Sequence, residues 1–333
     1  KVNQIGSGSF GSAWLVKRKQ DGAGVVAKEV KLAGVSSKEK MNILKEVEVM
    51  QKLSHENIVS LHEALEEGHS LYIIMELCDG GDLDKYIKGR RGSKIKEEKI
   101  VEMFAQICKG LHFMHSRRIL HRDIKGANIL LTKKGQVKLA DFGVARVMSE
   151  DTHQAMTQIG TPYYISPEIC EGKPYDGRSD VWSLGVVLYE MCTLKRPFVA
   201  GSLPALVVKI VRVKYEPIGP TEYSEGLRGL VSSCLVSKPG ERASLDDLMS
   251  SEVLDNHLQG AGGGTEPQGS ASSGGVSPAS SQLGASAKVG TFTSTQLGSS
   301  ADQMEVTEAT QLYKPSSQDE SEVMARQLAK LLK

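Results

Sequence analysis

The sequence has few cysteines, few aromatic residues and almost no net charge. Its five cysteines among 333 residues are scattered, with no C-x-x-C pair, so they indicate neither a zinc site nor a disulfide framework. A formal net charge of +1 gives no electrostatic reason to expect nucleic acid or a membrane surface as a partner. No apolar run approaches the roughly 20 residues of a membrane-spanning helix, and no signal peptide is apparent. We therefore expect reduced thiols and a cytoplasmic protein, with the nucleus or the cytoskeleton as alternative locations.

Hydrophobic residues make up 40% of the chain, enough for a full core, and the length allows one large or two ordinary domains. Residues 259–316 are rich in Gly, Ser and Ala with few large apolar side chains, which is the composition of a flexible linker. Residues 317–333 begin with a capping-box pattern and place apolar residues at helical spacing, which predicts a short amphipathic helix. A helix of that length is marginal in water by itself.

The most informative stretch is residues 121–128, which reads HRDIKGAN. It places an acid, a base and an amide between two apolar runs, one at Ile119 and Leu120 and one beginning at Ile129, which we interpret as short buried strands. A second carboxylate, Asp141, follows another apolar run in the sequence LADFG. A loop of merely solvated charges would not explain two carboxylates that each lie just beyond an apolar run.

Asp123, Asn128 and Asp141 together offer one base and two oxygen ligands for a hard cation such as Mg²⁺, which completes its shell with phosphate and water. Such a set suits phosphoryl transfer, in which positioning and charge neutralisation do most of the work. The motifs resemble HRDLxxxN and DFG of the protein kinases, with Ile124 in place of Leu and every other fixed position kept. The resemblance implies ATP and Mg²⁺ as cofactors and a protein substrate. It also implies Asp123 and Lys125 as catalytic residues, with Asn128 and Asp141 as metal ligands.

The same resemblance implies a bilobal protein-kinase fold of the α+β class. A small β-rich N-lobe would span residues 1–78 and a larger, mainly helical C-lobe residues 79–258, so one protein kinase domain would cover 1–258. The chain starts at Lys1 with only a few residues before its first glycine. We therefore expect the first strand of the N-lobe to be truncated at its start.

Residues 5–13 read IGSGSFGSA and contain a G-x-G-x-x-G pattern. In dinucleotide-binding folds a helix follows the third glycine. Here a strand, a turn at Asp21 and Gly22, and a second strand follow, which predicts a β-hairpin. Glycines at a hairpin tip let backbone amides approach phosphate closely, and Ala13 stands where the kinase pattern has Val. The resemblance assigns this segment to ATP binding: Ile5, Gly6, Ser7, Gly8, Ser9, Phe10, Gly11, Ser12 and Ala13.

Lys28 lies in the second strand of the hairpin, in the position of the kinase VAIK lysine. Lysines on edge strands usually point to solvent, but a carboxylate partner is available here. A helical pattern over residues 38–53 carries Glu46 in the place of the kinase helix-C glutamate. Glu48 lies about 200° round the helix from Glu46, so both cannot face the lysine. We predict that Lys28 pairs with Glu46, that both are catalytic residues, and that Lys28 also binds ATP.

Two further strands are predicted at residues 57–61 and 71–75, and a long helix at residues 99–115. The segment MELCDGGD after the second strand matches the kinase hinge. In this resemblance, backbone groups of Glu76 and Cys78 bind adenine, Met75 is the gatekeeper and Asp82 lies near the ribose. The remaining residues that the resemblance assigns to the ATP site are Ala27 and Leu130.

The polar segment after Asp141 leads into residues 160–168, which match the kinase activation segment. We predict that Thr157 is its activating phosphorylation site, modified by an upstream kinase or by the chain itself, with Ser149 and Thr152 as weaker candidates. Phosphate would bring a charge of about −1.5 to −2 and three acceptor oxygens. The side chains expected to bind that phosphate are Arg122 and Arg146. Thr161 is instead expected to contact Asp123 and Lys125.

Three structural residues are also assigned by the resemblance. Glu168, in SPE rather than the more usual APE, should pair with Arg242. Asp180 opens the next apolar helix. It could be simply the N-cap of that helix, or it could hold the backbone of the catalytic loop as in the kinase fold.

Lys125 and Thr161 match the Ser/Thr-specific pattern rather than the tyrosine-specific one. Three segments carry a closer similarity to the NIMA-related (Nek) kinases: residues 75–83, 114–125 and 160–168. The sequence GANIL at residues 126–130 is more typical of kinases at the top of MAP-kinase cascades, and that group is the alternative.

A pseudokinase scaffold and a small-molecule kinase are the two alternatives to an active protein kinase. A pseudokinase scaffold has no need of a complete catalytic set, whereas this chain keeps Lys28, Glu46, Asp123, Asn128 and Asp141. A small-molecule kinase shares loops of this type, but residues 160–168 match the segment that forms a peptide-docking shelf in protein kinases. A self-associating helical tail would suit a Nek-like protein, although this tail lacks a sustained heptad run.

Overall fold

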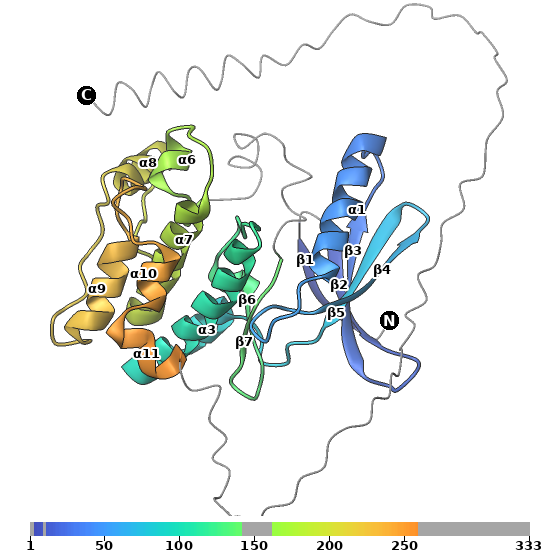
Figure 1. Ribbon diagram of the computed structural model, residues 1–333, viewed down its shortest axis with the longest axis horizontal. Helices are drawn as coiled ribbons and strands as arrows, with labels where there is room; N and C mark the ends of the chain where they lie inside the picture. The colour runs from blue at the N-terminus through green and yellow to red at the C-terminus, as the bar shows by residue number, and fades with distance from the viewer. Residues whose placement is uncertain (1–2, 9–10, 142–161, 259–333) are drawn as a thin grey trace, which may run out of the picture.

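A computed structural model describes residues 3–8, 11–141 and 162–258, which form two lobes (Figure 1). The elements of the N-terminal lobe are β1 (Asn3–Gly8), β2 (Gly11–Lys17), β3 (Gly24–Lys31), α1 (Ser37–Gln51), β4 (Leu61–Glu67) and β5 (Ser70–Glu76). Those of the C-terminal lobe are α2 (Leu83–Gly89), α3 (Glu97–Ser116), the 3₁₀ turn η1 (Gly126–Asn128), β6 (Ile129–Leu131), β7 (Val137–Leu139), α6 (Pro167–Cys170), α7 (Gly177–Thr193), α8 (Leu203–Val211), α9 (Glu225–Cys234), α10 (Leu245–Met249) and α11 (Glu252–Leu258). None of the described helices is long and apolar enough to cross a membrane.

The N-terminal lobe is an antiparallel five-stranded sheet in the order β1-β2-β3-β5-β4, with α1 packed beside it (Figure 1). Ser36 is the N-cap of α1 and forms a capping box with Glu39. The helix buries Ile43 and Val47 on one face. The predicted hairpin around Asp21 and Gly22 is confirmed, because β2 pairs antiparallel with β3. In the neighbouring pair of strands Gly8 pairs with Gly11, and residues 9–10 lie outside the described residues.

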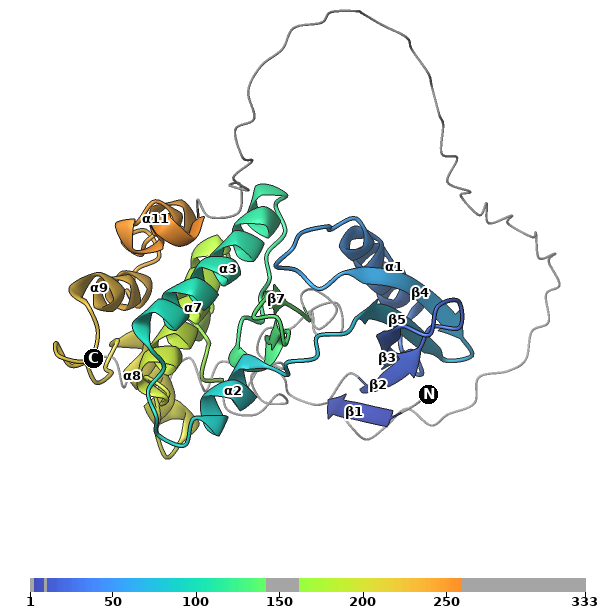
Figure 2. The ribbon, with the colours of Figure 1, turned by 90° about the horizontal axis from the view of Figure 1, so that it is seen from below.

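The C-terminal lobe is built on two long helices, α3 and α7. Helix α3 buries Ile100, Phe104, Ile107 and Leu111 at helical spacing, and α7 packs against both α3 and α9. The short hairpin β6–β7 lies between α3 and the five-stranded sheet (Figures 1 and 2). Because the HRD stretch and η1 precede Ile129, and Asp141 follows Leu139, the pairing partner of Ile129, the hairpin brings both motifs to one end.

Two strand predictions are wrong. Ile119 and Leu120 form no strand, because α3 ends in a reversal at Arg118 (φ 60°) and the Ile119 N–H bonds back to the Met114 carbonyl at 3.0 Å. The strand predicted at residues 57–61 begins only at Leu61.

The apolar run at residues 57–61 has a different cause. Ile58 and Val59 are buried against the C-terminal lobe rather than in the sheet. Ile58 forms a parallel bridge with Leu139, and the Val59 N–H bonds to the Leu139 carbonyl at 2.9 Å. Strand β4 itself is a largely exposed edge strand. Its sequence is mostly polar, so hydrophobicity does not indicate a strand at residues 61–67.

Candidate active site

The carboxylate of Asp123 is held by two neighbours from its own loop. Lys125 Nζ lies 2.7 Å from Asp123 Oδ2. The buried Asn128 donates from Nδ2 to the same oxygen at 2.7 Å and to the Asp123 carbonyl at 2.8 Å. Both side-chain bonds end on Oδ2, and no side chain among the described residues donates a hydrogen bond to Oδ1. The loop therefore presents an ionisable acceptor in a fixed orientation beside a cation.

Asp141 joins the two lobes. Its Oδ1 lies 2.7 Å from Nζ of Lys28, which is on β3 in the N-terminal lobe. Asp141 has a left-handed backbone (φ 58°), a conformation that is costly for a residue with a Cβ and that gathers at functional sites. Glu46 lies on α1, but its side chain is outside the described residues. The Lys28–Glu46 pair therefore stays a prediction, and Asp141 is a contact of Lys28 that the sequence reasoning did not anticipate.

A single buried carboxylate, Asp180, fixes the backbone that leads into Asp123. It accepts hydrogen bonds from the N–H groups of His121 at 3.0 Å and Arg122 at 2.9 Å. His115 Nε2 at 2.8 Å and the Tyr175 hydroxyl bind the same carboxylate.

Asp180 is not the N-cap of α7, because that role belongs to Asp176. The sequence analysis missed His115 and Tyr175. The available signal for His115 was a polar residue at the end of the otherwise apolar stripe of α3.

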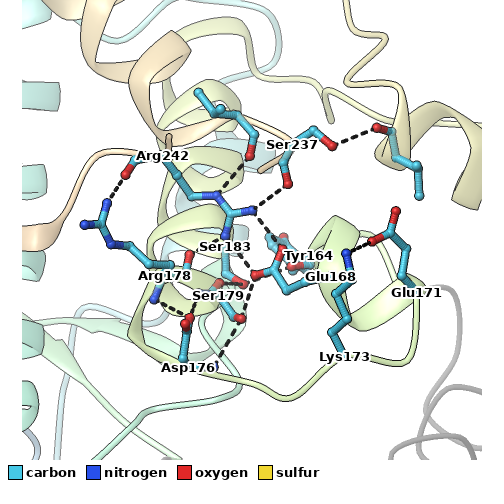
Figure 3. Close-up of polar contacts among 12 residues, drawn as sticks. Tyr164, Glu168, Glu171, Lys173, Asp176, Arg178, Ser179, Ser183, Ser237 and Arg242 are labelled. Atoms are coloured by element: carbon cyan, nitrogen blue, oxygen red, sulfur yellow. Dashed lines mark hydrogen bonds and ion pairs between the residues drawn. The ribbon is translucent and has the colours of Figure 1, made fainter. Parts of the chain in front are cut away.

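Arg242 and Glu168 form a buried ion pair in the C-terminal lobe (Figure 3). Arg242 Nη1 and Nη2 lie 2.9 and 2.8 Å from the two oxygens of Glu168, and the Ser179 hydroxyl donates to the same carboxylate at 2.7 Å. Although burial alone would raise it, the hydrogen bonds from Arg242 and Ser179 hold the pKa of Glu168 below its usual value. Arg242 also lies over the ring of Trp182 and donates from Nε to the Val236 carbonyl at 3.0 Å. This pair ties α6 to the chain between α9 and α10.

The segment that leaves β5 runs alongside β6. The Gly80 N–H bonds to the Leu131 carbonyl at 2.8 Å, and a Cβ on Gly80 would lie 2.8 Å from that same oxygen, so only glycine allows this approach. Asp82 forms a bridge with Leu130 and caps α2 through the Lys85 N–H at 2.8 Å. Cys78 is half-buried, and burial raises the pKa of its thiol to about 11. Of the residues predicted for the ATP site, Asp82 thus lies next to Leu130.

Glu76 is anchored by a contact that the sequence analysis missed. Nζ of Lys138, a buried residue of β7, lies 3.0 Å from Glu76 Oε2. The Ser60 N–H donates to the same oxygen at 3.2 Å. Since both partners use the side chain of Glu76, they leave its carbonyl out of these contacts.

Of the two arginines predicted to bind a phosphate on Thr157, the structure describes Arg122. It has a left-handed backbone (φ 67°), and its buried Nε has no hydrogen-bond partner among the described residues. Arg146, Thr157 and Thr161 lie outside the described residues, as do Ser9 and Phe10.

Comparison with known proteins identifies the class. A family model described as protein kinase domain matches residues 1–254, and the chain belongs to that family. Its architecture, a five-stranded N-terminal sheet joined to a helical lobe, is the bilobal α+β fold of protein kinases.

Within the family, the chain is similar to Nek proteins. It is 46% identical to mouse serine/threonine-protein kinase Nek1 over 259 residues, which is 78% of this chain and 21% of Nek1. Human Nek5 is 45% identical over 77% of this chain and 36% of its own length. Mouse Nek3 is 44% identical over 74% and 47%. The chain thus covers between 21% and 47% of the length of these relatives.

Proposed function

We propose that this chain is an ATP-dependent, Nek-like protein kinase that phosphorylates Ser and Thr hydroxyls of protein substrates. The observation that carries the proposal is the paired arrangement of Asp123 with Lys125 and Asn128, and of Asp141 with Lys28 across the two lobes. A scaffold without catalysis has no need of this geometry. The serine/threonine-protein kinase names of the Nek relatives support the acceptor class and favour Nek-like activity over the MAP-kinase-cascade alternative.

Each polar residue has a role that its contacts support. Asp123 accepts the proton of the substrate hydroxyl through Oδ1, which the bonds from Lys125 and Asn128 do not use, and orients the oxygen, while Lys125 balances the charge at Oδ2. Lys28 orients the α- and β-phosphates, with Glu46 as its second partner on α1. Backbone groups of Glu76 and Cys78 bind adenine.

Magnesium fits the oxygen atoms that these contacts leave available. Asn128 uses Nδ2 to bind Asp123, which leaves its Oδ1, and Asp141 uses Oδ1 to bind Lys28, which leaves its Oδ2. One carboxylate and one amide oxygen, completed by phosphate and water, are ligands that Mg²⁺ accepts. When bound, the ion neutralises phosphate charge. Among the described residues no cluster of three or more His, Cys, Asp or Glu side chains could hold a metal by itself.

A peptide library with Ser, Thr and Tyr acceptors tests the proposal directly. The chain should transfer phosphate from ATP in the presence of Mg²⁺, giving phosphoserine and phosphothreonine and little phosphotyrosine. Asp141→Ala should stop transfer and weaken Mg²⁺-dependent ATP binding, measured separately by titration calorimetry. Absence of transfer from the wild-type chain, or an Asp141→Ala variant with unchanged Mg²⁺ dependence of ATP binding, would contradict it.

Phosphorylation of Thr157 is the switch that we propose for this kinase. The buried Nε of Arg122, without a described partner, is suited to bind a phosphate. Phosphatase treatment should therefore lower activity, and Thr157→Ala should reproduce that loss, whereas Thr152→Ala should not. Arg122→Ala should make the remaining activity insensitive to phosphatase. The idea fails if Thr157→Ala is fully active while mass spectrometry finds no compensating phosphorylated residue.

We further propose that residues 1–258 form the kinase domain, followed by a flexible linker at 259–316 and a short helix at 317–333 that mediates association. Both C-terminal segments lie outside the described residues. We propose a cytoplasmic location, with the nucleus or cytoskeleton as alternatives. The thiols of Cys170, Cys192 and Cys234 are buried, and burial raises the pKa of each to about 12, which suits unreactive reduced cysteines.

A further inference from the structure

A buried carboxylate on α7, Glu190, contacts Tyr164, which lies shortly before α6. Its Oε2 accepts a hydrogen bond from the Tyr164 hydroxyl at 2.8 Å. The Tyr164 carbonyl in turn accepts from Ser183, also on α7, at 2.9 Å. Glu190 is 8% exposed, so it is one of the few buried acids of the described chain. Tyr164 is therefore fastened to α7 at both its side chain and its backbone.

Arg196 contacts this arrangement from the loop between α7 and α8. Its guanidinium carbon lies 3.7 Å from the centroid of the Tyr163 ring, which is the geometry of a cation–π contact. Its Nε lies 3.6 Å from Glu190 Oε1, an ion-pair contact longer than a hydrogen bond. One side chain thus stacks on Tyr163 directly and acts on Tyr164 through Glu190.

This cluster, made of Tyr163, Tyr164, Glu190 and Arg196, lies near the catalytic loop. Asp84 contributes to the electrostatic surroundings of both Tyr164 and Glu190. The backbone of Asp84 packs against Gly126, where an added Cβ would come within 3.1 Å of the Asp84 nitrogen. Gly126 directly follows Lys125. An extended peptide advances about 3.3 Å per residue, so substrate residues a few positions from the hydroxyl at Asp123 can reach the cluster.

We propose that Arg196 is a positioning residue for the protein substrate, which holds the surface formed by Tyr163 and Tyr164 in place. The inference rests on the proposed kinase activity. Direct capture of a basic substrate residue by Glu190 is less favoured, because both of its oxygens already have partners and little of it is exposed. Among the described residues, neither Arg196 nor Glu190 forms a hydrogen bond, ion pair or ring contact with those that bind nucleotide in the proposed function, so ATP binding should not depend on them.

The arrangement also makes substrate binding depend on pH. Burial raises the pKa of Glu190 to about 7, against the opposing effects of Tyr164 and Arg196 and with a further raising effect of Asp84. Above this pKa the carboxylate is charged and attracts Arg196. Below it the carboxylate is neutral and the attraction is lost. The KM for the protein substrate should therefore rise as pH falls through the pKa of Glu190.

Steady-state kinetics with a histidine-free peptide substrate test the inference. Arg196→Ala should raise the KM for peptide by about tenfold above the Glu190 pKa, as expected for loss of a cation–π contact and an ion pair. The kcat and the KM for ATP should stay within about twofold, since the catalytic loop is not touched. Arg196→Lys, which keeps the charge but not the planar stack, should give an intermediate KM and keep the pH dependence.

Two further variants separate the proposed role of Arg196 from a general effect of losing one positive charge. Lys195→Ala, an exposed neighbour with the same loss of charge, should behave as wild type. Tyr163→Leu removes the ring on which Arg196 stacks and should raise the peptide KM as Arg196→Ala does. Arg196→Ala should also abolish the pH dependence of the peptide KM.

A wild-type chain without phosphate transfer would contradict the proposed function itself. An active wild-type chain whose peptide KM is unchanged in both Arg196→Ala and Tyr163→Leu would overturn only this inference.

Discussion

Asp123→Asn should reduce phosphate transfer by about a thousandfold, the size expected for loss of a general base, while ATP affinity stays close to that of the wild type. The amide has the shape of the carboxylate, and its oxygen can still accept from Lys125 and Asn128. It cannot take a proton from the substrate hydroxyl. The variant therefore removes one chemical property and leaves the loop packing in place.

Turnover and ATP affinity should be measured on the same preparation of Asp123→Asn. Asp246→Asn provides a matched control, because it makes the same chemical change at a carboxylate that is 82% exposed and pairs with His112. That control should keep wild-type turnover. If Asp123→Asn retains turnover within a few-fold, Asp123 is not the base. If its ATP affinity collapses as well, the loss of turnover reports a damaged nucleotide site instead.

The catalytic loop was predictable because its partners are close in sequence. Asp123, Lys125 and Asn128 are within one loop, so the motif alone predicts their proximity, and the structure places them at 2.7 Å contacts. Asp180 also contacts this loop, but from a helix that begins far along the chain. No local pattern distinguishes that carboxylate from an N-cap. Only the kinase resemblance suggested that Asp180 holds the backbone of the catalytic loop. Neither the local pattern nor the resemblance indicated Tyr175 as a further partner of Asp180.

The same limit explains the missed ion pairs. Lys28 contacts Asp141 across the lobes, and Lys138 contacts Glu76 between β7 and the end of β5. In each case the strand pattern predicts the element but not the neighbour that tertiary packing brings to it. Residues 57–61 show the converse error, since the burial of Ile58 and Val59 was correctly signalled by hydrophobicity but attributed to the wrong lobe.

Loss of the buried Arg242 side chain should be the most destabilising single change in the C-terminal lobe that we predict. Arg242→Ala should lower the free energy of unfolding by about 3–5 kcal/mol, because it leaves the Glu168 carboxylate buried without a cation. The side chains of Arg242 and Glu168 are 0% and 3% exposed, so water cannot replace the lost partner. The contacts of Arg242 with Trp182 and the Val236 carbonyl disappear at the same time.

Urea unfolding followed by circular dichroism should measure this loss against two comparisons. Lys238→Ala removes a nearby ion pair with Glu241 whose side chains are 76% and 62% exposed, and it should leave the free energy of unfolding almost unchanged because water screens the pair. The double variant Glu168→Met with Arg242→Met should recover part of the stability that Arg242→Met loses, since no unpaired charge then remains inside. If Arg242→Ala costs no more than Lys238→Ala, the pair does not stabilise the lobe. If the double variant is as unstable as Arg242→Met, the loss comes from packing around Trp182 rather than from the unpaired carboxylate of Glu168.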